Sequence, residues 1–205
     1  MNPTDLTPPI AAPAPPAAPT SAGRKFLAFI VELVQVLAIS LAIILPVRYF
    51  LIQPFYVKGA SMEPNFYDHE YLIIDELSYR FHDPARGDIV VFRYPKDPSQ
   101  FFIKRVIGLP GETVEIADGG VKIYNAAHPN GAAVTEPYID QAVTSGTQTV
   151  TLKPGEYYLM GDNRVASMDS RIFGPVPRSD IVGRVWLRGY PLDRWKLFEA
   201  TTYQL

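Results

Sequence analysis

The sequence predicts a mainly β protein, in which an antiparallel β-sheet domain with a small β-subdomain follows one N-terminal transmembrane helix. Two observations predict this class: many short apolar runs follow Pro54, and a single long apolar run precedes them. The chain of 205 residues is long enough for one domain with a hydrophobic core. Composition divides it into a tail (residues 1–23), an apolar segment (residues 24–53) and the β domain (residues 54–205).

The tail, residues 1–23, consists mostly of Pro, Ala, Thr and Ser. Proline removes backbone hydrogen-bond donors, and small side chains bury little apolar area. Such a segment cannot offset the entropy lost on ordering, so we expect it to be disordered.

The apolar segment, residues 24–53, contains the run from Phe26 to Pro46, which is 21 residues long and has Glu32 and Gln35 as its clearly polar members. At about 1.5 Å per residue, it spans a hydrocarbon core of roughly 30 Å. A cleaved signal peptide is disfavoured, because the run is too long and bulky residues follow it. A buried core helix remains open, since Glu32 and Gln35 share one helix face. A single transmembrane anchor fits best.

The charges at the ends of this run bear on its orientation. Arg24 and Lys25 precede it, which favours a cytoplasmic N-terminus, because basic residues are enriched on that side of the membrane. Arg48 on the far side weakens the argument.

The β domain is predicted from short runs rich in Val, Ile, Tyr and Phe, each bounded by Pro, Gly or Asp. These residue types favour strands, and the bounding residues favour turns. The runs are residues 55–59, 71–75, 88–92, 101–108, 113–116, 120–125, 149–152, 156–161 and 181–189.

Composition excludes several classes of function. There is no cysteine, so disulfides, thiolate catalysis and cysteine-ligated metals are excluded. The net charge is −2 with both signs interspersed, so no nucleic-acid partner is expected. His69, His82 and His128 show no metal-ligand spacing, so we expect no metal site and no cofactor.

Ser61 is a candidate nucleophile. It follows Gly59 and Ala60 and precedes Pro64, and small residues before a serine let a substrate backbone approach closely. A tight turn there exposes the hydroxyl together with the Ser61 amide, which is a candidate oxyanion donor. The same residues are also typical of an ordinary turn.

Lys104 lies in the apolar run of residues 101–108, directly before Arg105. In a strand, Lys104 shares a face with Phe102 and Val106, while Arg105 points to the other side. Two adjacent cations on opposite faces of an apolar strand cannot both reach water easily, so one should be buried or paired. A buried lysine whose pKa falls by about three units, at a cost of roughly 4 kcal/mol, can act as a general base. A surface lysine on an edge strand is the alternative.

The segment Gly161–Arg171 is dense in polar groups, although it follows an apolar strand. Buried polar groups must satisfy one another, and a solvated loop is the alternative. The pairings that the sequence permits are Asp162 with Arg105, Asp169 with Arg171, and Ser167 with an amine such as Lys104.

Four ordered motifs resemble those of the type I signal peptidases, serine proteases with a Ser/Lys dyad. They are Gly59–Pro64, Arg86–Phe92, Lys104–Gly111 and Gly161–Arg171, and the resemblance covers residues 26 to 190, including the anchor. The stretch of residues 112–155 has no matching motif, and we expect it to form the variable, smaller subdomain.

The resemblance implies roles for individual residues. Ser61 is the expected nucleophile and Lys104 its general base. The residues expected to support the site are Ser167, which orients the lysine amine, and Asp162, Arg105, Asp169 and Arg171, which brace it by ion pairs. Met62 matches a residue that lines the substrate pocket, and we expect the apolar side chains of Val57 and Phe102 to line that pocket with it. Gly59 departs from one branch of the family, in which a serine donates to the oxyanion hole.

The expected function is removal of signal peptides from exported preproteins by a single-pass enzyme of the plasma membrane, with its N-terminus cytoplasmic and residues 54–205 extracytoplasmic. The expected partners are these preproteins and the lipid bilayer. Three alternatives remain: a specialised processing peptidase of a secretion or conjugation system, a self-cleaving regulator, and a non-enzymatic membrane-tethered β domain. The regulator would need a DNA-binding domain, and it gives no reason for the anchor.

Overall fold

The computed structural model of the protein describes residues 22–50, 52–139 and 143–199. The predicted disordered tail therefore lies almost wholly outside the described residues. Contacts along the chain divide it into two units, Met1–Ile44 and Leu45–Leu205.

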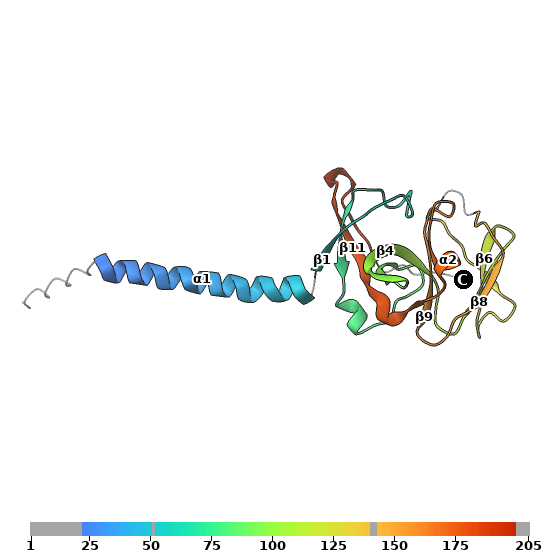
Figure 1. Ribbon diagram of the computed structural model, residues 1–205, viewed down its shortest axis with the longest axis horizontal. Helices are drawn as coiled ribbons and strands as arrows, with labels where there is room; N and C mark the ends of the chain where they lie inside the picture. Colours follow the sequence, from blue (N-terminus) through green and yellow to red (C-terminus); the bar gives the residue numbers. More distant parts are fainter. Residues whose placement is uncertain (1–21, 51, 140–142, 200–205) are drawn as a thin grey trace, which may run out of the picture. The chain divides into compact units, whose positions relative to one another are not determined.

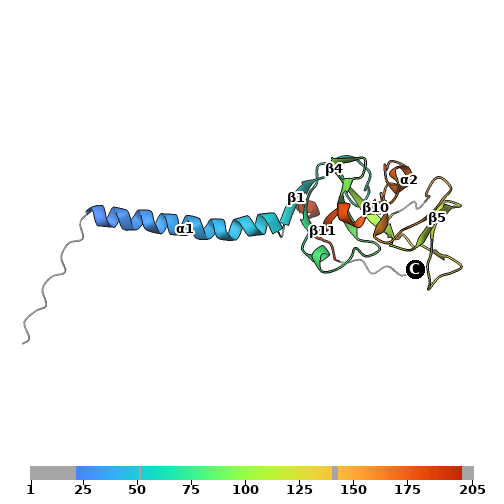
Figure 2. The ribbon, with the colours of Figure 1, turned by 60° about the horizontal axis from the view of Figure 1, so that its bottom comes forward.

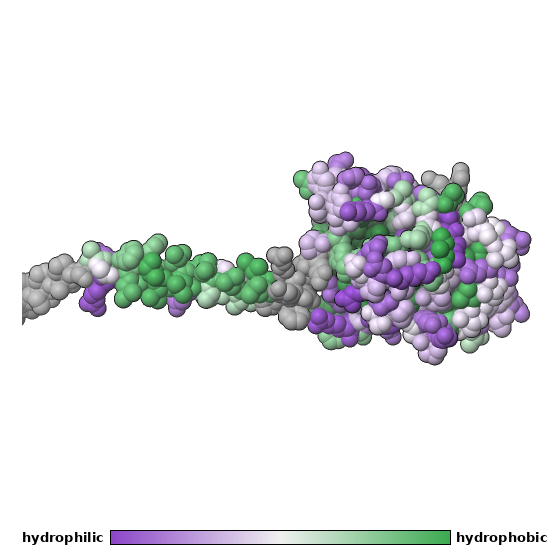
Figure 3. Space-filling view, viewed as in Figure 1, coloured by the Kyte–Doolittle hydropathy of each residue, from purple (hydrophilic) through white to green (hydrophobic). Residues whose placement is uncertain are grey.

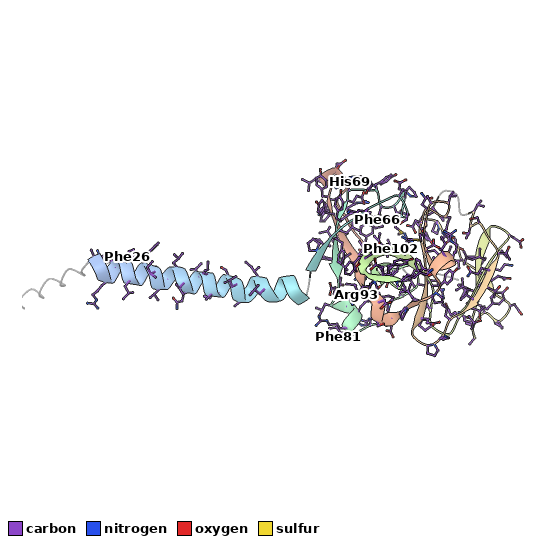
Figure 4. The ribbon with its side chains drawn as sticks, viewed as in Figure 1. Phe26, Phe66, His69, Phe81, Arg93 and Phe102 are labelled. Atoms are coloured by element: carbon purple, nitrogen blue, oxygen red, sulfur yellow. The ribbon has the colours of Figure 1, made fainter. Side chains whose placement is uncertain are left out.

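Helix α1 (Ala22–Phe50) contains the long apolar run (Figure 1). Its apolar side chains from Phe26 to Leu45 are exposed, so that most of this surface appears green in Figure 3, and Phe26 near the start points outward in Figure 4. Within the described part of the chain, α1 alone is long and apolar enough to cross a membrane, over Ala22–Leu45. It has the length and composition of a membrane span, and its side chains are not those of a buried core helix.

A large antiparallel sheet follows, with the strand order β1-β2-β11-β3-β4-β9-β10 and with β12 beside β11. Its strands are β1 (Ile52–Tyr56), β2 (Tyr71–Asp75), β3 (Ile89–Tyr94), β4 (Asp97–Gly108), β9 (Glu156–Met160), β10 (Val176–Pro177), β11 (Ile181–Tyr190) and β12 (Lys196–Leu197). Ile52 and Gln53, which the composition groups with the apolar segment, thus begin the first strand.

A smaller antiparallel sheet is formed between β4 and β9 in the sequence, with the order β7-β6-β5-β8. Its strands are β5 (Thr113–Ala117), β6 (Gly120–Tyr124), β7 (Ala132–Ala133) and β8 (Gln148–Thr151). Figures 1 and 2 show it at the end of the β domain opposite β1. It shares a core with the large sheet, because Val114 and Ile123 pack with Ile107 of β4 and with Tyr158 and Met160 of β9.

Four short helices complete the described chain: α2 (Ser170–Phe173) and the 3-10 helices η1 (Ser78–Arg80), η2 (Arg178–Asp180) and η3 (Leu192–Arg194). The predicted class, a mainly antiparallel β protein with one N-terminal apolar helix, is confirmed.

Strand β4 follows the predicted alternation. Val106 belongs to one hydrophobic cluster, against which Phe102 packs, while Ile103 packs against a second and Ile107 belongs to a third. Strand β3 pairs with β4 on one side, and β9 pairs with its C-terminal part on the other. Lys104 is therefore held in the middle of the sheet, at the point where β4 gains its second neighbour.

Candidate active site

Ser61 and Lys104 lie together although 43 residues separate them, because β4 carries Lys104 to the turn that bears Ser61. Lys104 Nζ is 2.8 Å from Ser61 Oγ. The turn is closed by a hydrogen bond from the Glu63 amide to the Ala60 carbonyl at 3.2 Å. Met62, next to Ser61, is buried in the hydrophobic core, so it anchors the turn and leaves the serine hydroxyl half-buried.

Lys104 is 3% exposed, and the pKa of its amine falls to about 8. Burial is the largest cause, because it penalises the charged form, and attraction to Asp169 and Asp162 partly opposes it. Apart from Ser61, the amine donates to the Ile103 carbonyl at 2.8 Å. A lysine held in this way is neutral often enough near pH 7 to accept a proton.

Arg105, on the opposite face of β4, forms the predicted ion pair with Asp162. Its Nε and Nη2 donate to the two carboxylate oxygens at 2.8 and 2.7 Å, and both side chains are buried. The Asp162 carboxylate also accepts from Asn65 Nδ2 at 2.9 Å. Of the two adjacent cations, Arg105 is thus paired with a carboxylate and Lys104 is bonded to a serine.

Asp169 and Arg171 form the second predicted pair, with Nη2 and Oδ2 2.7 Å apart. Burial alone would raise the pKa of Asp169, but hydrogen bonds from Arg171 and from the Gly161 amide lower it below its usual value. The carboxylate also caps α2, since it accepts from the Arg171 amide. Asp169 is therefore charged and fixed.

Ser167 approaches the site closely, but it does not bond to Lys104. Its buried Oγ meets no partner at full hydrogen-bonding geometry among the described residues, but the hydroxyl interacts with Asp169 and helps to lower the pKa of that carboxyl. It lies directly against Gly161, where an added Cβ would come within 2.1 Å of it and within 2.5 Å of the Ser61 carbonyl oxygen. Only a glycine at position 161 allows this approach of the segment to Ser61.

A pocket of about 460 Å³ opens beside the Ser61 and Lys104 side chains. Figure 3 shows an apolar recess on this face of the β domain, in the region where Figure 4 labels Phe102. Val57 and Phe102 line this pocket, together with Phe101 and Met168, whereas Met62 lies in the core and does not line it.

Comparison with known proteins agrees with this geometry. Residues 30–190 match the family described as "Signal peptidase, peptidase S26". The chain is 35% identical to a probable signal peptidase I-1 of Synechocystis sp. over 85% of this chain and 90% of the relative. It is 30% identical to signal peptidase IB of Staphylococcus aureus, over 82% of this chain and 93% of the relative.

The chain belongs to the signal peptidase family, peptidase S26. As an S26 peptidase it is a serine peptidase, so the non-enzymatic alternative is excluded. A crystal structure of a signal peptidase I from Enterococcus faecalis is 34% identical, with a TM-score of 0.44, and the alignment covers 50% of this chain and 97% of that one.

Other residues of this S26 peptidase were not identified as candidates from the sequence. Arg164, within the Gly161–Arg171 segment, is buried and paired with Glu136. Tyr138 places its ring 3.8 Å from the Arg105 guanidinium carbon. Arg164 could have been found from its place in a motif, but Glu136 and Tyr138 fall in the motif-free stretch and gave no signal.

The backbone conformation at position 59 explains why a glycine stands there. Its φ is +86°, a region that favours glycine, and its amide donates to Asp68 Oδ1 at 3.0 Å. An added Cβ would meet nothing within 4 Å, so space is available but the backbone conformation opposes a side chain.

Proposed function

We propose that this chain is a membrane-anchored endopeptidase that removes signal peptides from exported preproteins, with Ser61 as nucleophile and Lys104 as general base. The observation that carries the proposal is the 2.8 Å separation of Lys104 Nζ and Ser61 Oγ, combined with a lysine pKa lowered to about 8. Both the family and the geometry support this assignment.

The reaction would proceed through an acyl-enzyme. Neutral Lys104 accepts the proton of the Ser61 hydroxyl as Oγ attacks the scissile carbonyl carbon. The resulting ammonium gives this proton to the leaving amine, the C–N bond breaks, and the signal peptide remains as an ester on Ser61. Lys104 then takes a proton from water, which attacks the ester, and the released serine oxygen recovers its proton.

Two groups are proposed to assist. The Ser61 amide is the candidate donor to the oxyanion, since Gly59 offers no side chain for this purpose. Ser167 is proposed to hold the lysine amine during the reaction. Its buried hydroxyl lies at the site and interacts with Asp169, the carboxylate that also attracts the lysine amine, so a rotation about its Cα–Cβ bond would turn it from Asp169 to Lys104.

The ion pairs are proposed to act indirectly. Asp162 with Arg105, and Asp169 with Arg171, would fix the two carboxylates that face Lys104, so that its amine keeps one position and one electrostatic environment. Substrate would lie in the pocket beside Ser61, where Val57 and Phe102 present apolar walls to small side chains before the cut. Met62 would not contact the substrate and would act indirectly, by fixing the turn that bears Ser61.

The proposed location is the plasma membrane, with α1 crossing once, the N-terminus cytoplasmic and the β domain outside. Arg24 and Lys25 before the span support this orientation. An anchor confines enzyme and substrate to one surface, which raises their effective concentration. Because the natural chain has no cysteine, a single cysteine placed at exposed Lys153 reports the orientation directly. A membrane-impermeant maleimide should label it in intact cells. Labelling only after lysis would show that the β domain lies on the cytoplasmic side and would refute the proposed orientation.

The test of the activity is cleavage of a preprotein with small residues at the first and third positions before the cut. Wild type should cleave it, whereas folded Ser61→Ala and Lys104→Met should not. Full activity of Ser61→Ala would refute the mechanism. A specialised processing peptidase would share these outcomes with its own substrate but would leave general preproteins uncut.

A further inference from the structure

A buried ion pair connects the stretch after β7 to the Gly161–Arg171 segment. The Glu136 and Arg164 side chains are 2% and 1% exposed. Arg164 Nη1 donates to Glu136 Oε2 at 2.6 Å and to Thr144 Oγ1 at 2.7 Å, and its Nη2 donates to Glu136 Oε1. Burying two charges carries a large desolvation cost, so such a pair is weak evidence for stability and invites another explanation.

Arg164 holds the active-site segment at two places. Its Nε donates to the Gly161 carbonyl at 3.0 Å. The Arg164 carbonyl accepts a hydrogen bond from Arg171 Nη1 at 2.8 Å, and Arg171 forms an ion pair with Asp169. The same segment contacts the nucleophile, because the Asn163 amide donates to the Ser61 carbonyl at 3.1 Å. A shift of Arg164 would therefore move groups on both sides of the dyad.

Tyr138, two residues after Glu136, reaches the other ion pair. Its hydroxyl donates to Glu136 Oε1 at 2.6 Å, and its ring lies over the Arg105 guanidinium. Its carbonyl accepts from Asn65 Nδ2 at 2.7 Å, and that nitrogen also donates to Asp162. Glu136 thus links, through Arg164 on one side and Tyr138 on the other, the segments that hold Asp169 and Asp162.

We propose that Glu136, Tyr138 and Arg164 form a brace by which the smaller subdomain positions the two carboxylates around the catalytic lysine. They are positioning residues, since they act through Asp162 and Asp169. The inference rests on the proposed roles of Ser61 and Lys104. It gives the motif-free stretch a part in the reaction, which the sequence did not indicate.

Loosening the brace should let water reach the site. The charged groups around Lys104 are Asp162 and Asp169, each paired with its arginine, and Lys58 on the pocket wall. Burial is the main cause of the lowered lysine pKa, so hydration should raise it. Less neutral amine would then be present at a given pH, and misplacement should lower kcat more than it weakens substrate binding.

The test is Glu136→Gln in the full chain in detergent micelles, with Glu112→Gln as its matched control. Glu112 forms a similar buried pair with Arg86, at 2.6 Å, also at the boundary of the two sheets. Its other bonds go to the Leu109 amide and to Asn125, away from the Gly161–Arg171 segment. Both variants lose the carboxylate charge of a buried ion pair, so purely structural effects should be alike.

Glu136→Gln should lower kcat about tenfold or more per folded molecule, with KM changed by less than about twofold. The acid limb of its kcat/KM profile should move to higher pH by roughly half a unit. Glu112→Gln should leave kcat and the acid limb at their wild-type values. Equal behaviour of the two variants would overturn the brace.

Two measurements keep the outcome decisive. If Glu136→Gln does not fold, Tyr138→Leu removes the ring and hydroxyl but keeps the carbonyl that Asn65 uses, and it should show the same kinetic change. Hydrogen exchange of the Gly161 and Asn163 amides needs no substrate and should accelerate in the brace variants only. Unchanged exchange would refute the brace, whereas wild type failing to cleave any preprotein would refute the proposed function alone.

Discussion

The protonation of Lys104 gives a quantitative prediction for the pH dependence of cleavage. With a pKa of about 8, about one-tenth of the amine is neutral at pH 7 and about half at pH 8. At the ordinary value of 10.5, only about 0.03% would be neutral at pH 7. Burial thus supplies roughly 300 times more base at neutral pH, equivalent to about 3 kcal/mol.

The expected profile of kcat/KM therefore rises about tenfold per pH unit up to pH 8 and levels off above it. The sign follows from the base role, because activity is lost as the pH falls through the lysine pKa. Steady-state cleavage of a peptide without titratable groups near the cut would measure it, since kcat/KM reports the free enzyme. A flat profile from pH 5 to 8, or a limb near 10, would refute the reasoning.

Three further variants test the site. Lys104→Met should be inactive yet more stable than wild type by up to about 3 kcal/mol at pH 7. The lysine pKa is lower in the folded state, so this gain in stability should shrink as the pH rises from 8 to 10.5. Urea unfolding of both proteins at pH 8 and at pH 10.5 measures it, and an equal difference in the free energy of unfolding at the two pH values would contradict the lowered pKa. Gly161→Ala places a Cβ against Ser167 and the Ser61 carbonyl, and we expect about a hundredfold loss of kcat in a protein folded by circular dichroism. Near-normal kcat would show that the segment yields easily. Gly59→Ser must hold a positive φ and should lower the free energy of unfolding by about 1 kcal/mol, as thermal denaturation can show; unaltered stability would contradict the assigned backbone.

Much of the fold could be predicted, because β-branched and aromatic runs between turn residues identify strands whose alternation is set locally. The two-residue strands β7, β10 and β12 were missed, since they exist only through pairing with longer strands. The first four residues of β4, from Asp97 to Gln100, resemble a turn in composition, and of these Asp97 pairs with Tyr94 of β3.

For the site, the order of the motifs predicted that Ser61 and Lys104 form a pair, and their side chains are hydrogen-bonded in the structure. The burial of Met62 in the core and the failure of the Ser167 hydroxyl to bond to Lys104 could not be foreseen, because they depend on how the turn and the polar segment pack. Glu136 lacked any signal for the same reason. Its partner Arg164 lies 28 residues away, and only tertiary packing makes the pair.

The proposal that Lys104, and not Arg105, is the base is supported by the charges buried around them. Each buried arginine of the described chain has a carboxylate partner; these are Arg86 with Glu112, Arg105 with Asp162, Arg164 with Glu136, and Arg188 with Glu70. Lys104 is the buried basic residue that forms no ion pair with any described carboxylate, and its amine is bonded to a hydroxyl and a carbonyl instead. A buried cation without a counter-ion is the one whose neutral form the protein favours. The pairing of every buried arginine of the described chain, with Lys104 left without a carboxylate partner, therefore supports Lys104, the residue that touches Ser61, as the proposed base.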